Sequence, residues 1–119
     1  MALYNAPYGV ARRAIIWSLS LANDLGSALA MIPPPESRAV SNQGQFPELQ
    51  RQGLQTIADA SCTLFAGDSG APLTLAPILG PREPIEPILA ARLRHATSQL
   101  SLSVTFERYQ GGWLRVLGI

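Results

Sequence analysis

Residues 100–119, LSLSVTFERYQGGWLRVLGI, carry the pattern that decides the fold. Apolar residues at 100, 102, 104 and 106 alternate with polar ones, and this period of two is typical of a β-strand with one buried face. After the segment YQGG, the chain returns as a second apolar run. Glycine accepts the positive φ of tight turns, so this stretch predicts an antiparallel β-hairpin with its turn at Gly111 and Gly112.

A long apolar helix is expected near the N-terminus, before this hairpin. Across residues 9–32, apolar side chains recur at steps of three and four and cover most of the helix circumference. Such a helix must be covered on most sides, by its own chain or by a neighbouring subunit. The three prolines at 33–35 end the helix, because proline lacks the N–H that a helix interior needs. Residues 36–45 show no periodicity and are expected to form a surface loop.

Two further helices are expected later in the chain. The first covers residues 47–60, with Pro47 at its first position and with Gln50 and Arg51 facing out. Gly53 lies in its middle, where glycine weakens a helix by ~1 kcal/mol relative to alanine. The second covers residues 87–98.

A second hairpin is expected between these two helices. Two short apolar runs, 62–66 and 72–76, flank a Gly-Asp-Ser-Gly cluster, which is typical of a hairpin. The predicted fold class is therefore α+β: a long apolar N-terminal helix and two further helices packed on a small antiparallel sheet of two β-hairpins. We expect a single domain over residues 1–119, with 1–8 as a possible extended arm.

Composition limits the classes of partner. Only 14% of the 119 residues are charged, against ~25% in an average soluble domain, and the formal net charge is +1. This balance creates no long-range field for nucleic acid or anionic lipid, so nucleic acid is an unlikely partner. The apolar run that begins at Ala14 is interrupted at Asp24, well short of the ~20 apolar residues that a membrane-spanning helix needs. We therefore expect no membrane span.

Residues 11–30 resemble a secretory leader in outline, with two arginines, an apolar run and an Ala-x-Ala ending. Asn23 and Asp24 interrupt the segment after a short apolar run. We therefore expect no cleaved signal peptide, and a cytoplasmic location or a place in an assembled particle.

One cysteine and one histidine exclude an internal disulfide and a usual structural zinc site within one chain. Cys62 is expected to be a small buried hydrophobic residue. We expect no cofactor, no metal and no small-molecule ligand.

Residues 67–72, GDSGAP, resemble the nucleophile loop of chymotrypsin-like serine proteases. In that family a histidine and an acid precede the serine, whereas no histidine precedes Ser69 here. Gly, Asp and Ser also build tight turns, and the turn interpretation is favoured. The alternative is a small serine hydrolase in which Ser69, His95 and an acid such as Asp59 meet in space.

A second alternative is an arginine-dependent nucleic-acid-binding protein, with Tyr109 and Trp113 available to stack on bases. No fold signature of such a reader is present in the sequence. Its candidate patch comprises Arg12, Arg13, Arg92, Arg94 and Arg115.

The low content of charged residues and the helix that is apolar over most of its circumference favour a surface that is covered in an assembly. Trp, Tyr and Arg concentrate binding energy at such interfaces. The sequence therefore predicts a homo-oligomer or a complex with other protein subunits. The predicted function is a non-catalytic, self-associating structural or adaptor subunit, for example of a virion or a secretion assembly. The predicted interface residues are Tyr4, Tyr8, Ile16, Trp17, Leu19, Trp113 and Arg115.

Overall fold

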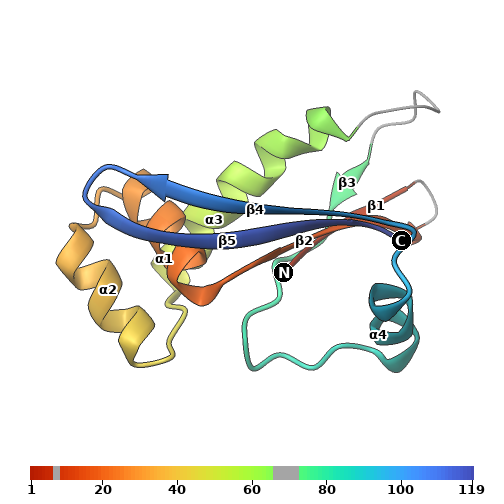
Figure 1. Cartoon of the computed structure of the whole chain (residues 1–119), viewed down its shortest axis with the longest axis horizontal. Coiled ribbons are helices and arrows are strands. Elements are labelled where there is room, and N and C mark those ends of the chain that lie inside the picture. Colours follow the sequence, from red (N-terminus) through yellow and green to blue (C-terminus); the bar gives the residue numbers. More distant parts are fainter. Residues whose placement is uncertain (7–8, 66–72) are drawn as a thin grey trace.

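A five-stranded antiparallel sheet forms the centre of the protein in the computed structural model, which describes residues 1–6, 9–65 and 73–119 (Figure 1). Its strand order is β3-β1-β2-β5-β4, so the N-terminal and C-terminal hairpins meet where β2 pairs with β5. The predicted α+β class is confirmed. The strands are β1 (Ala2–Asn5), β2 (Ala11–Trp17), β3 (Thr74–Leu75), β4 (Ser98–Phe106) and β5 (Tyr109–Gly118).

Three helices lie towards one side of the molecule, and a fourth lies near its other end (Figure 1). Tyr4 in β1 donates its hydroxyl to the carbonyl of Ala58 in α3 at 2.9 Å, which fixes α3 over the sheet. The helices are α1 (Leu19–Leu29), α2 (Pro34–Asn42), α3 (Glu48–Ala60) and α4 (Pro87–Arg94). The main core cluster comprises Ala2, Tyr4, Ile15, Ala22, Leu54, Ala58 and Ile78.

The predicted C-terminal hairpin is present as β4 and β5, but the predicted position of its turn is wrong. The turn lies at Glu107 and Arg108, and Arg108 has a φ of 71°. Gly111 and Gly112 lie inside β5, where Gly111 has a φ of 74° beside a register shift. A Cβ on Gly112 would overlap the side chain of Ser18, so the glycines allow the start of α1 to lie directly against β5.

The prediction of one long helix over residues 9–32 is also wrong. Residues Ala11–Trp17 form strand β2, and α1 begins only at Leu19. β2 lies between β1 and β5, so both of its edges are paired. The adjacent residues Ala14 and Ile15 point to opposite faces of the sheet and are both buried, so both faces are covered at that point of the strand. A strand buried on both faces is a continuous apolar run, which periodicity cannot distinguish from a buried helix. Ser18 then caps α1 by accepting from the N–H of Leu21.

Residues 36–45, expected as a loop, instead lie largely in helix α2. Pro34 is at its first position and Glu36 is in its first turn, where the helix dipole favours a carboxylate. The helices predicted at 47–60 and 87–98 are present as α3 and α4. α4 is shorter than expected, because the chain enters β4 at Ser98.

The hairpin predicted from runs 62–66 and 72–76 is not formed by the residues that the structure describes. Ser61–Leu64 form a 3-10 helix, and Thr74–Leu75 form β3, which pairs with β1. Residues 66–72 lie outside the described residues. Ala2–Asn5, within the expected arm, form β1 and pair with both β2 and β3.

Helices α1 and α3 cross in backbone contact at Gly26 and Gly53. A Cβ on Gly53 would lie 2.5 Å from the carbonyl oxygen of Gly26 and 2.9 Å from its Cα. The expectation that Gln50 faces out is wrong, because this crossing buries Gln50 at 4% exposure. Gly53 is therefore present for close packing, at the expense of helix propensity.

A buried carboxylate connects α1 to α2 and to the hairpin. Asp24 in α1 accepts from the hydroxyl of Ser37 in α2 at 2.6 Å and from the N–H of Gly111 in β5 at 2.7 Å. Asn23 beside it donates to Ser41 and to the carbonyl of Gln45. Since buried polar groups need such partners, these bonds fix where α2 and the hairpin sit against α1.

Candidate functional site

Strand β4 forms one edge of the sheet and exposes an apolar row. Leu100 is 55% exposed and Leu102 is 45% exposed, although both belong to the strictly alternating part of the sequence. In the β4–β5 register, Leu100 lies opposite Val116 and Leu102 lies opposite Leu114. Val116 and Leu114 pack against the main core, so the apolar row continues from the core onto an edge that it leaves uncovered.

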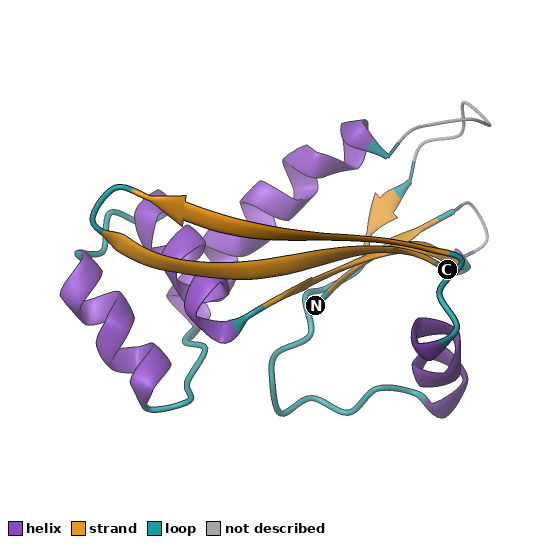
Figure 2. Cartoon of the chain, in the orientation of Figure 1, coloured by secondary structure: helices purple, strands orange, loops and turns teal. Residues whose placement is uncertain are grey.

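The same strand carries no charge. Residues Ser98–Phe106 contain none of Asp, Glu, Lys or Arg, and no proline. The nearest charged residues along the chain are Arg94 before the strand and Glu107 after it. Edge strands are usually protected against pairing by charged residues, proline, bulges or very short length. β4 has nine residues and, among the residues that the structure describes, pairs with β5 alone, on one side (Figure 2).

On the opposite face of the hairpin, Trp113 and Arg115 lie together. The Arg115 guanidinium is 5.2 Å from the centre of the Trp113 ring, within the range of a cation–π contact. Trp113 is 45% exposed. These two predicted interface residues lie opposite Ser103 and Ser101 of β4, so they share a face with the serines of the edge strand.

Three more predicted interface residues, Ile16, Trp17 and Leu19, gather elsewhere. They line a hollow of about 230 Å³ at the end of β2, together with Leu79 and Ile85. All three are partly buried, so they are neither enclosed in the core nor freely exposed.

The two predicted interface tyrosines differ from the rest. Tyr4 is fully buried and lies edge-on to Phe65, with ring centres 4.8 Å apart. It has no exposed surface with which to contact another chain. Tyr8 lies outside the described residues.

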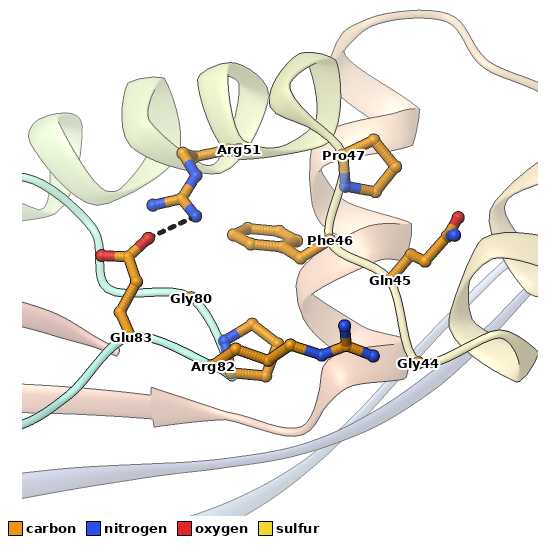
Figure 3. Close-up of a pocket in the computed structure, with 9 residues that line it drawn as sticks. Gly44, Gln45, Phe46, Pro47, Arg51, Gly80, Arg82 and Glu83 are labelled. Atoms are coloured by element: carbon orange, nitrogen blue, oxygen red, sulfur yellow. Dashed lines mark ion pairs between the residues drawn. The ribbon is translucent and has the colours of Figure 1, made fainter.

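A second, larger hollow of about 450 Å³ opens between residues 44–47 and 80–83 (Figure 3). Arg51 of α3 projects into it above the ring of Phe46, at 5.4 Å from the ring centre. Its guanidinium bonds to Glu83 at 2.6 Å and donates to the carbonyl of Ile78. A Cβ on Gly80 would lie 2.7 Å from Nη2 of the same guanidinium, so the loop passes close to the end of the Arg51 side chain.

The polar contacts in this hollow join two parts of the same chain, α3 and the 78–83 segment. The hydrogen bond from Arg51, followed by one from the Gly80 backbone, lowers the pKa of the Glu83 carboxyl. Because Arg51 is occupied by Glu83 and Ile78, it holds the 78–83 segment against α3 and is not free to bind an anion. Sequence reasoning missed this contact, because it placed Arg51 on an outward face and nothing local joins it to Glu83.

For the hydrolase alternative, the structure places two of the three candidate residues. Ser69 lies outside the described residues. His95 is exposed just after the end of α4, and Asp59 is exposed near the end of α3. Within the residues described, no group of three or more His, Cys, Asp or Glu side chains could hold a metal ion.

The arginines of the nucleic-acid alternative are only partly brought together. Arg92 donates to the carbonyl of Ala11 and Arg13 donates to the carbonyl of Arg12, so the Arg92 and Arg13 side chains both lie near the start of β2. Arg115 lies further along the sheet, opposite Ile16.

Cys62 is half-buried, and burial raises the pKa of its thiol, with a smaller contribution from Asp59. None of the helices in the described parts of the chain is long and apolar enough to cross a membrane.

No protein-family model, no curated protein and no solved structure matches the chain.

Proposed function

We propose that the chain is a non-catalytic, self-associating structural or adaptor subunit of a larger assembly. The observation that supports this most directly is strand β4, a nine-residue edge that is exposed, uncharged and apolar on one face. Such an edge offers unpaired backbone N–H and C=O groups to another chain. An edge of this kind is usually blocked in a protein that works alone, but β4 has no charged residue and no proline, and its register shift with β5 lies only at its far end, between Val104 and Phe106.

The exposed apolar side chains add to this argument. Fully burying a leucine side chain contributes about 1.5 to 3 kcal/mol, so covering the half-exposed Leu100 and Leu102 contributes about 1 kcal/mol each. Association costs at least ~4 kcal/mol in lost translational and rotational freedom. Two leucines on one copy do not offset that cost, whereas an interface that buries them on both copies and pairs the strands comes close to doing so.

The composition agrees with this proposal. Charged residues make up 14% of the chain, and all nine basic residues are arginine. Arginine is enriched and lysine is depleted at protein interfaces. The exposed Trp113 with its stacked Arg115 extends the candidate contact region to the second face of the hairpin.

Light scattering after size exclusion, repeated over a concentration series, tests the proposal. We expect a mass that rises above the 12.7 kDa of one chain to a defined multiple as concentration increases. A mass of one chain at every concentration, including millimolar protein, would contradict it.

A further inference from the structure

We infer that two copies of this chain pair through β4 in an antiparallel, two-fold symmetric manner, with Leu102 opposite Leu102 of the second copy. This inference rests on the proposed function and names its partner and its contact surface. The two five-stranded sheets would join into one continuous sheet across the symmetry axis. The contact is isologous, as in most closed protein dimers.

The side-chain pattern of β4 is complementary to itself in this alignment. Leu102 is the midpoint of Ser98–Phe106, so pairing about Leu102 uses the whole strand. It places Leu100 opposite Val104 of the second copy on one face. On the other face it places Ser101 opposite Ser103. A shift by a single residue would place leucine opposite serine and move each side chain to the wrong face.

Charged residues flank the uncharged strand. Arg94, the last residue of α4, is the nearest before β4, and Glu107 and Arg108 follow it. Antiparallel pairing brings the start of one strand to the end of the other, so Glu107 falls opposite Thr97 of the second copy, three residues after Arg94. A parallel arrangement would instead place like charges side by side.

The free edge is long enough for a specific contact. Nine residues at about 3.3 Å each span roughly 30 Å, and strand addition of this kind takes its affinity from backbone hydrogen bonds. The exposed row of Leu100 and Leu102 would meet the same row of the second copy across the axis. The serines of both strands would meet on the opposite face, where they can hydrogen-bond to one another.

A cysteine placed at the axis tests the geometry. Directly opposite residues of antiparallel strands have Cα atoms about 4.5 to 5.5 Å apart, which lies within the range that a disulfide spans. We would introduce Leu102→Cys into a Cys62→Ser background and oxidise it with a mild thiol oxidant. We expect a covalent dimer on a non-reducing gel. The matched control, Leu49→Cys, lies on α3 at 52% exposure and is expected to remain monomeric on the gel.

A charge-swap pair tests the register. Ser101→Glu with Ser103→Glu places two carboxylates opposite each other twice per dimer, and we expect the dimer dissociation constant to rise about tenfold. Ser101→Glu with Ser103→Lys has the same number of substitutions at the same exposed positions, and we expect it to restore dimerisation. Equal dissociation constants for the two double variants would overturn the register. Circular dichroism of both variants checks that the fold is kept.

The outcomes separate this inference from the proposed function. A wild-type chain that is monomeric at all concentrations overturns both. A wild-type dimer whose mass is unaffected by either β4 double variant, and which forms no disulfide through Leu102→Cys, overturns the β4 contact alone and leaves self-association through another surface. A Leu102→Cys disulfide at the same low yield as Leu49→Cys also counts against the β4 contact.

Discussion

Replacing Gly53 by alanine is expected to destabilise the protein, although helix propensity alone predicts the opposite. Alanine in a helix interior is favoured over glycine by ~1 kcal/mol. At this position the added Cβ would lie 2.5 Å from the carbonyl oxygen of Gly26 and 2.9 Å from its Cα. Both atoms belong to the backbone of α1, so no side-chain rotation relieves the overlap. Helices α1 and α3 must therefore move apart.

The magnitude follows from the two opposing effects. Overpacking a close contact costs about 1 to 3 kcal/mol, and moving α1 away from α3 also loosens the packing of Leu54 against Ala22 in the main core. Taking ~2 kcal/mol for overpacking and ~1 kcal/mol for the loosened core, and subtracting the ~1 kcal/mol gained in helix propensity, we expect a loss of about 2 kcal/mol in the free energy of unfolding. For a chain of this size that corresponds to a melting temperature lowered by roughly 8 °C.

Urea unfolding followed by circular dichroism measures this change. Thr56→Ala is the matched control, because Thr56 is exposed in the same helix and the substitution also favours the helix. We expect the midpoint of Thr56→Ala to equal or slightly exceed that of the wild type. Gly26→Ala should resemble Gly53→Ala, since its Cβ would lie 2.7 Å from the carbonyl carbon of Gln50.

A midpoint for Gly53→Ala that rises together with the midpoint of Thr56→Ala would refute the reasoning. It would mean that α1 and α3 do not cross in backbone contact. The double variant Gly26→Ala with Gly53→Ala provides a second check, because two substitutions in one contact should not add. A strictly additive loss would place the two glycines in separate environments.

Three further predictions concern polar and charged side chains. Burial, with a smaller contribution from Cys62, raises the pKa of Tyr4 to about 12. The contribution of Tyr4 to folding stability is therefore fully present below pH 10 and is lost as pH rises towards 12. Tyr4→Phe should abolish that alkaline loss in pH-dependent urea titrations and should cost about 1 kcal/mol at pH 7. Asp24→Ala leaves the donors of Ser37 and Gly111 without an acceptor and should cost about 3 kcal/mol in urea unfolding, whereas the exposed Asp59→Ala should cost almost nothing. Glu83→Gln removes the ion pair with Arg51 and should speed amide hydrogen exchange across residues 78–83 without changing global stability; in the wild type the same loosening should appear as pH falls through the lowered pKa of Glu83.

The elements that the sequence predicted well are those with a single apolar face. Helix α3 has a narrow apolar stripe, and the C-terminal hairpin alternates strictly. The helical period of the first and the strand period of the second can therefore both be recognised in the sequence. Strand β2 was mistaken for helix because its two faces are both covered and its apolar run is continuous. Two clues were present: consecutive β-branched residues at Ile15 and Ile16, which favour a strand, and Ser18 in a position to cap the helix that follows.

The prolines at 33–35 were assigned to the end of a helix, although Pro34 begins one. Proline is tolerated in the first turn because its missing N–H has no partner there in any helix. The sequence pattern alone does not distinguish the two roles. Glu36 in the first turn was the local signal that favoured a beginning.

The structure brings together only some of the predicted interface residues. Trp113 and Arg115 do lie together on the hairpin, but Tyr4 was assigned to an arm because nothing local shows that Ala2–Asn5 pair with strands on both sides. The local sequence pattern also does not predict the edge position of β4, because strand order depends on the whole chain. The pairing of Arg51 with Glu83 depends in the same way on contacts between distant segments.

The pairing of β2 with β5 has a consequence for how the protein is made. It joins segments about 100 residues apart, and such non-local contacts form slowly. On the ribosome, at about 5 to 20 residues per second, β2 waits roughly 5 to 20 s for its second neighbour to be synthesised. During that interval Ile15 and its neighbours in the nascent chain are not yet covered by a complete sheet. Chaperones that bind extended apolar segments could therefore bind this part of the chain before β5 is synthesised.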